Sequence, residues 1–362
     1  MKKVCCVLLA LFFLLTVALF AAAADAEPVA SGICGADGDH LTWTLDTNGV
    51  LTIAGTGRME SYPQGFPNVT PECTTAPWGD YAAQIKTVIV GDGVETIGDS
   101  AFCGCTEITR AQIGQDVTDI YQYAFGRCTA LQSVTLPDGL RHLYTGVFSG
   151  CASLERLSLP DALTEIAPWL CFGCTSLQTV TFGKAVESIG MEAFRNCTSL
   201  AAVTLPDSLR SIGSGAFQNC TALESVRFDL FDSSDLHEIQ MNAFDGCTTL
   251  QQFEVPYRTT RIYAQAFANS GLRDLTVRSY NCTIHPSAIS PLVTIHGYAG
   301  SEAEAFAERN ELNFVPLPDD GTVPPASDPP QPQPHITLLQ RIRNRIAAFF
   351  MRILELLGFA HI

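Results

Sequence analysis

Apolar residues recur with a fixed period through the middle of this 362-residue chain. Isoleucine, replaced once by leucine, returns every 23 residues from Ile97 to Ile262, except for one step of 27 residues between Ile212 and Ile239. In most copies a small residue and a phenylalanine follow, then a cysteine, and then a Leu-x-x-Val-x-Leu segment. Such a period is typical of a solenoid, because one copy cannot bury its apolar face alone.

The Leu-x-x-Val-x-Leu segment predicts a short strand whose alternate side chains enter the core, as at Leu200, Val203 and Leu205. Stacked copies would place these strands about 4.8 Å apart, in a parallel sheet roughly 40 Å long. We expect the Ala-Phe pair to fill the opposite side of each coil, on a turn. A second short strand or extended segment is predicted near each isoleucine.

The pattern of apolar and polar residues changes at both ends of the repeat region. Residues 41–45 and 50–53 alternate around a turn and predict a β-hairpin that covers the first coil. Trp43 and Trp78 are expected to be packing residues of this cap. At the other end we predict a strand at 294–298, a helix at 301–310 with Ser301 and Glu304 as a capping box, and an extended segment at 313–317.

The motif I-G-x-x-A-F-x-x-C-x-x-L-x-x-V-x-L-P resembles the BspA-like leucine-rich-repeat family and covers more than half of the chain in eight copies. The resemblance implies an α/β-type repeat solenoid that is mainly β. It is a right-handed coil with a parallel sheet, an N-terminal β cap, a C-terminal helical cap and a separate C-terminal amphipathic helix. It also implies adhesion-type roles, although many unrelated recognition tasks share a solenoid.

Residues 1–24 have the pattern of a secretory signal: Lys2 and Lys3, an apolar run, and then small residues. The start looks bacterial, so we expect a secreted or cell-surface location. Changes in residue pattern and composition set the other boundaries. We expect an N-terminal β capping module at 25–84, repeats at 85–291, a C-terminal cap at 292–317, a proline-rich linker at 318–335 and a basic amphipathic helix at 336–362.

The chain is acidic, with a formal net charge of −16 that becomes −18 when the two lysines of the signal are removed. No nucleic-acid partner is expected for such a chain, and no metal or cofactor is expected. The longer copy carries Asp229, Asp232 and Asp235, whose spacing is compatible with calcium, but a solvated loop is the stronger interpretation. Insertions in solenoids are often where binding occurs.

The cysteine column is expected to hold buried, reduced thiols, because stacked Cβ atoms lie farther apart than a bridge allows. Its members are Cys105, Cys128, Cys151, Cys174, Cys197, Cys220 and Cys247. Cys34 and Cys73 are the candidate disulfide in an oxidising compartment. Cys171 occupies a phenylalanine position and is expected to be buried. The redox state of Cys103 and Cys282 stays open.

The C-terminal segment has an apolar stripe at a spacing of three and four residues and a face rich in arginine. The stripe consists of Leu339, Ile342, Ile346, Phe349, Ile353 and Leu356. Three interpretations remain: peripheral membrane contact, helix pairing with another copy or a partner, and docking on the acidic solenoid. The segment is too charged to span a bilayer.

No catalytic motif appears in the sequence, and the histidines are scattered, so we expect no enzyme. The leading hypothesis is an exported recognition scaffold that binds a protein or glycan of a host or neighbouring cell. On the polar strand face, Arg110, Arg156 and Arg227 are the candidate binding residues, because interface hot spots favour arginine. The alternative is a structural, envelope-associated protein whose C-terminal helix mediates membrane or partner association.

Overall fold

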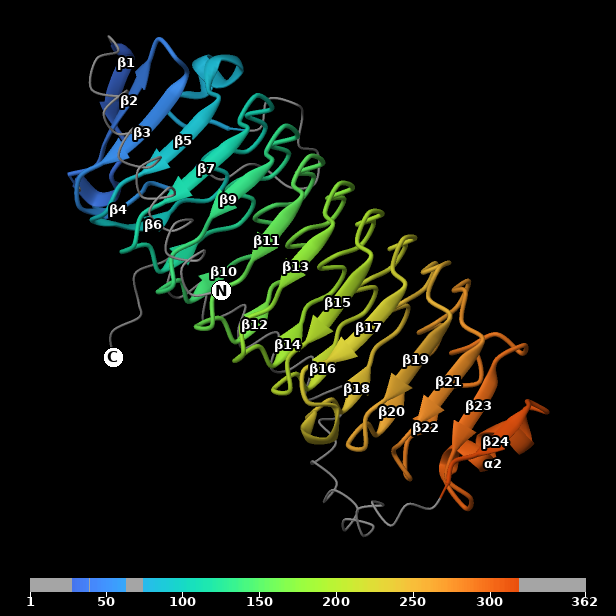
Figure 1. The fold of residues 1–362 in the computed structure, drawn as a ribbon. Coiled ribbons are helices and arrows are strands. Elements are labelled where there is room, and N and C mark those ends of the chain that lie inside the picture. Colours follow the sequence, from blue (N-terminus) through green and yellow to red (C-terminus); the bar gives the residue numbers. More distant parts are fainter. Residues whose placement is uncertain (1–27, 39, 63–73, 319–362) are drawn as a thin grey trace, which may run out of the picture. The chain divides into compact units, whose positions relative to one another are not determined.

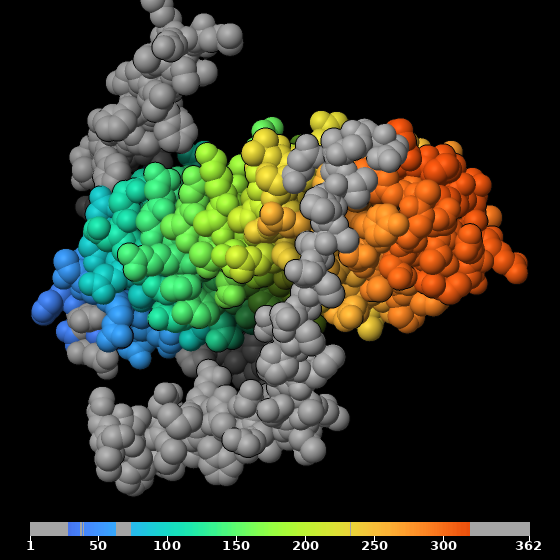
Figure 2. Space-filling view, turned by 90° about the horizontal axis from the view of Figure 1, so that it is seen from below, coloured from blue at the N-terminus to red at the C-terminus, as the bar shows by residue number. Residues whose placement is uncertain are grey.

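The computed structural model describes residues 28–38, 40–62 and 74–318, apart from the side chains of Asp37 and Asp232. The chain divides into two compact units, Met1–Pro318 and Asp319–Ile362. The predicted signal, Cys73, the linker and the C-terminal apolar stripe lie outside the described residues. Within the first unit, successive coils follow one another in chain order, as Figures 1 and 2 show.

Each coil carries one longer strand, and these strands lie side by side on one side of the solenoid (Figure 1). They are β5 (Thr87–Val90), β7 (Arg110–Ile113), β9 (Ser133–Thr135), β11 (Arg156–Ser158), β13 (Thr179–Thr181), β15 (Ala202–Leu205), β17 (Ser225–Phe228), β19 (Gln252–Val255), β21 (Asp274–Val277) and β23 (Thr294–Gly297). Every pairing among them is parallel. The predicted strand positions and their parallel arrangement are confirmed.

A second, shorter strand in each coil ends at the recurring isoleucine or leucine, as predicted. These strands are β6 (Val94–Ile97), β8 (Asp119–Ile120), β10 (His142–Leu143), β12 (Glu165–Ile166), β14 (Ser188–Ile189), β16 (Ser211–Ile212), β18 (Glu238–Ile239), β20 (Arg261–Ile262) and β22 (Thr283–Ile284). They pair in parallel in two sheets, β4 to β10 and β12 to β22. Between them the chain forms turns that carry the Ala-Phe pair.

The phenylalanine column forms stacked rings inside the coil. Phe194 and Phe217 stack with their centroids 5.4 Å apart, and Phe217 and Phe244 repeat this spacing. Phe148 stacks only on the preceding ring, at 5.9 Å, because the next position of the column is Cys171. All these rings are fully buried, so the column closes the side of the core opposite the long strands.

The column cysteines are buried and form no disulfide among the described residues, as predicted. The thiol of Cys220 donates to the main-chain oxygen of Phe194 in the preceding coil, with an S···O distance of 3.1 Å, and Cys128, Cys151, Cys174 and Cys247 make equivalent bonds. Each thiol therefore links two coils. Cys34 is also a free, buried thiol; its pairing with Cys73 stays a prediction.

Two backbone positions in every copy adopt the left-handed conformation, one before the Ala-Phe pair and one after it. Gly146 holds the first position in its copy, with φ +65°, and a Cβ atom there would lie 2.3 Å from the ring of Tyr123. Gly173 holds the second position in the next copy, with φ +73°, and has no atom within 4 Å of such a Cβ. The turns therefore demand positive φ, and in one place also an empty Cβ position.

The N-terminal cap is the predicted hairpin, preceded by another strand. β1 (Pro28–Ile33), β2 (Thr42–Asp46) and β3 (Val50–Ala54) pair antiparallel, and β3 continues in parallel onto β5. The remaining elements are β4 (Gly57–Arg58) and two 3₁₀ turns, η1 (Ala36–Gly38) and η2 (Gly79–Gln84). Trp78 stacks on Phe102 at 5.4 Å and donates its indole N–H to Ala101, so it extends the ring column into the cap.

The C-terminal cap is the one predicted. Helix α2 (Glu302–Arg309) follows β23, and β24 (Phe314–Pro316) pairs with β23 in parallel. Ser301 accepts the N–H of Glu304, while the Glu304 carboxylate accepts the N–H of Gly300 rather than that of Ser301. In this capping box the glutamate side chain therefore accepts from the residue before the N-cap instead of from the N-cap itself. Phe306 is buried against the last coil.

The long strands do not form the continuous sheet expected from their stacking. Their ladder is interrupted between β9 and β11, between β13 and β15, and between β17 and β19. The shorter strands remain paired across the last two of these boundaries. At these two boundaries the coils are therefore held together on one side while the strand face is divided.

Candidate functional site

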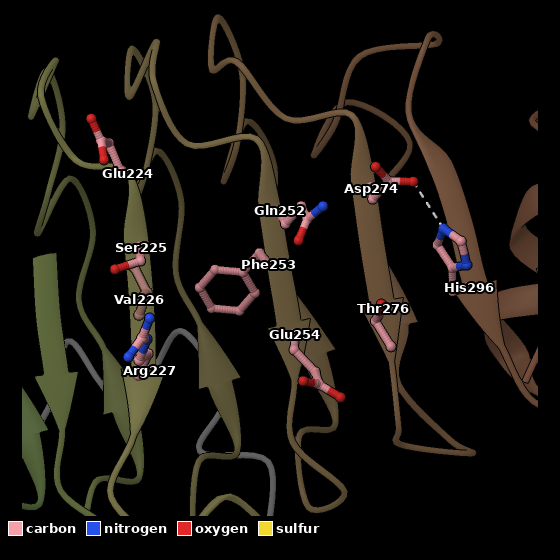
Figure 3. A pocket seen from close by; sticks show the side chains of 10 residues that line it. All are labelled: Glu224, Ser225, Val226, Arg227, Gln252, Phe253, Glu254, Asp274, Thr276 and His296. Carbon is pink, nitrogen blue, oxygen red and sulfur yellow. Dashed lines mark hydrogen bonds and ion pairs between the residues drawn. The ribbon is translucent and has the colours of Figure 1, made fainter.

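A groove opens on the strand face at the boundary between β17 and β19, and we call it the strand-face groove (Figure 3). Its hollow has a volume of about 540 Å³ and is lined from β17, β19, β21 and β23. An adjoining hollow of about 390 Å³ shares Glu224 and Gln252 with it. The lining is mostly polar, since the strand positions that point away from the core face this space.

At this boundary the core column contains a large side chain, Phe253. In its core column the register aligns Val203 with Val226 in one pair of strands, and Phe253 with Leu275 in another, so Phe253 is bulkier than its neighbours. Its ring projects between β17 and β19 (Figure 3) and contacts the rings of Phe244 and Phe267 at 5.2 and 5.0 Å. The ring is almost fully buried and packs on the phenylalanine column beneath the groove.

The charged groups of the groove fall into paired and unpaired sets. Asp274 accepts a hydrogen bond from His296 at 2.9 Å, and Glu254 accepts one from Arg278 at 2.7 Å. Burial works to lower the pKa of Arg278, but the hydrogen bond to Glu254 helps to raise it above its ordinary value. Glu224 makes no ion pair with any described residue.

Only one of the three predicted binding arginines reaches this groove. Arg110 on β7 and Arg156 on β11 are exposed on the same strand face, but neither lines the groove. Arg227 on β17 lines it, is exposed, and forms no ion pair within the part of the chain that the structure describes. The roles of all three stay predictions. The sequence analysis did not single out His296, because the repeat pattern fades in its strand.

The loop of the longer copy lies directly after β17. It contains the 3₁₀ turn η3 (Phe231–Ser233) and exposes Leu230, at 65% of its surface. The ring of Phe231 lies 6.1 Å from that of Tyr257. Asp235, one of the residues considered for calcium, forms an ion pair with Arg258. The loop is therefore folded against its neighbours.

The described residues contain no group of three or more His, Cys, Asp or Glu side chains that could hold a metal ion. One serine and histidine contact exists: the hydroxyl of Ser287 lies 3.0 Å from Nδ1 of His285, which also accepts the Ser287 N–H. Since both residues are exposed and two positions apart, this contact is a local turn. Within the described ranges, no helix is long and apolar enough to cross a membrane.

Comparison with known proteins returned no match among curated proteins. Solved structures do match. A leucine-rich repeat protein from Bacteroides ovatus is 18% identical, with a TM-score of 0.39, covering 77% of this chain and 99% of that chain. A leucine-rich repeat protein from Eubacterium ventriosum is 20% identical, with a TM-score of 0.35, covering 72% and 98%. A leucine rich cell surface protein from Faecalibacterium prausnitzii is 20% identical, with a TM-score of 0.33, covering 81% and 97%.

The repeat itself identifies the family. A model of the BspA type leucine rich repeat region matches residues 80–186 and 170–291, in six copies. These residues make up more than half of the chain, and they coincide with the coils that carry the ring column and the thiol column. The chain therefore belongs to the BspA-type leucine-rich-repeat family.

Proposed function

We propose that this protein is an exported, non-enzymatic recognition scaffold, which binds a protein or glycan of a host or neighbouring cell through its strand face. The observation that carries the proposal is the strand-face groove. It is an open hollow on the solenoid, lined by a guanidinium, amide, hydroxyl and carboxylate groups. Such a mixture of donors and acceptors suits a polar ligand held by many hydrogen bonds.

The construction of the solenoid supports this role. The short strands pair in parallel within two sheets, and the ring column behind the strand face is buried, so the strand face is presented on a packed support. Rigid presentation lowers the conformational entropy lost on binding. The polar lining of the groove suits recognition of a polar ligand.

Binding to arrays of host proteins, bacterial surface proteins and glycans would test the proposal. We expect Arg227→Ala to weaken binding of the captured ligand by about tenfold or more, because truncated interface hot spots cost 2 kcal/mol or more. Arg141→Ala is the matched control, since it removes an exposed arginine that does not line the groove. Equal effects of both changes, or no ligand on any array, would contradict the proposal.

A location at the cell surface is part of the same proposal, and a truncation after Leu317 separates it from the role of the tail. We expect the truncated chain to keep its affinity for the ligand, because the strand-face groove lies entirely within the unit Met1–Pro318. Retention at the cell surface, measured by fractionation, reports on the C-terminal segment alone. If the truncated chain loses all binding, the structural, envelope-associated role gains support.

A further inference from the structure

Two departures from the regular repeat coincide at one coil boundary. β17 and β19 are not joined by a ladder, and the loop that follows β17 belongs to the only copy with a 27-residue step between Ile97 and Ile262. The facing edges of β17 and β19 therefore present main-chain donors and acceptors that lack ladder partners. A ligand with its own main chain along the groove can satisfy such groups, as in recognition by strand edges.

The loop adds an exposed apolar side chain at the end of β17. Leu230 is held in place because its N–H donates to the Asp207 carboxylate at 2.6 Å, and the rings of Phe228 and Phe231 lie 5.8 Å apart just beside it in the chain. We call Leu230, Phe231 and Tyr257 the apolar ledge. An exposed leucine three residues after Arg227, which lines the groove, favours a partner that carries an apolar side chain.

The groove has an acidic end. Figure 3 shows Glu224, Gln252 and Asp274 at the same end, with Arg227 and Glu254 toward the other. Three carboxylates line the hollow, of which Asp274 is paired with His296 and Glu254 with Arg278, so Glu224 is the carboxylate left for a ligand. Charge complementarity favours a basic side chain at the end near Glu224, whose carboxylate has no ion-pair partner among the described residues.

From these features we infer that the occupant of the strand-face groove is an extended polypeptide segment, with a lysine or arginine beside Glu224 and an apolar residue on the apolar ledge. This inference rests on the proposed function and narrows it to a protein ligand. Glu224 and Leu230 are six residues apart, so an extended segment would span about 20 Å between its two anchors. The groove suits a glycan less well than a peptide, because the ring of Phe253 is only 3% exposed and offers no face for a sugar to stack on.

Selection from a display library of random dodecapeptides on the purified full chain tests the inference. We expect the enriched peptides to carry a basic and an apolar residue roughly five to seven positions apart, because an extended chain advances about 3.3 Å per residue. Binding of synthetic copies should weaken about tenfold or more in the double variant Glu224→Gln, Asp274→Asn. Leu230→Ser should weaken it several-fold, on the order of one lost apolar contact.

Matched controls exist elsewhere on the solenoid. Glu165→Gln removes an exposed carboxylate from the other side of the coil, and Leu292→Ser removes a leucine that is 90% exposed; both should leave the affinity within about twofold. Circular dichroism establishes that each variant keeps its fold.

No enriched peptide, enrichment of acidic peptides, or affinity that ignores the groove variants would overturn the inference. Capture of a glycan whose binding depends on Arg227 would overturn the peptide assignment and leave the proposed function standing. If neither the library nor the arrays yield a ligand that depends on the groove, both fail.

Discussion

Stacking in the ring column should contribute measurably to stability, and the column contains its own control. Phe217 has a stacked ring on both sides, at 5.4 Å and at interplanar angles of 9° and 5°. Phe148 has a stacked ring on one side only, at 5.9 Å, because Cys171 follows it. Both side chains are fully buried, so replacement by leucine removes similar apolar surface at the two positions.

An aromatic pair contributes about 0.5–1.5 kcal/mol beyond its buried area. Phe217→Leu loses two pairs and Phe148→Leu loses one, so the first change should lower the free energy of unfolding by about 0.5–1.5 kcal/mol more than the second. Urea unfolding followed by circular dichroism measures both values. The two free energies can be compared if they depend on urea concentration with the same slope in both variants. A change in that slope would mean that unfolding is no longer a single cooperative transition, as happens in some arrays of repeats. An equal or larger loss in Phe148→Leu would refute the reasoning.

Three further predictions follow from the turns, the thiols and the C-terminal cap. Gly146→Ala should lower the free energy of unfolding by at least about 1 kcal/mol more than Gly173→Ala, because only the first places a Cβ against the ring of Tyr123; equal losses would count against this. Burial raises the pKa of Cys247 from 9.0 to about 12, so the stability that this thiol contributes is present below pH 9 and is lost as the pH rises from 9 toward 12. Urea midpoints across that range should fall less steeply in Cys247→Ser than in the unchanged chain, and parallel curves would exclude the effect. Ser301→Ala should cost about 1 kcal/mol, seen as faster hydrogen exchange in helix α2, and unchanged exchange would show that the cap contributes little.

Much of the fold was predictable because the repeat imposes the same physical requirement on every copy. The isoleucine, phenylalanine and leucine positions are buried wherever they recur, as at Ile189, Phe194 and Leu200. The free, buried state of Cys197 followed from the spacing of stacked coils alone. Even the caps were recognisable, since a solenoid must cover the apolar surface of its end coils.

The candidate site was predictable only in part. The polar strand face and Arg227 were named from alternation, but the groove depends on which neighbouring strands fail to pair. The signals were present in Phe253, which occupies a position held elsewhere by smaller apolar residues, and in the 27-residue step before it. Neither signal gives the groove itself, because the sequence does not show that β17 and β19 fail to pair while the shorter strands β18 and β20 stay paired.

The regular and irregular parts of the chain therefore have separate consequences. Where the period is kept, most neighbouring long strands pair in ladders, and the strand face carries mainly polar side chains. Where the period lengthens and Phe253 enters the core column, main-chain groups, a hollow and an exposed leucine appear together. Because a repeat protein depends only on contacts between neighbouring coils, such a departure at one boundary leaves the distant coils unchanged. Specificity can thus be placed at a single boundary without rebuilding the solenoid.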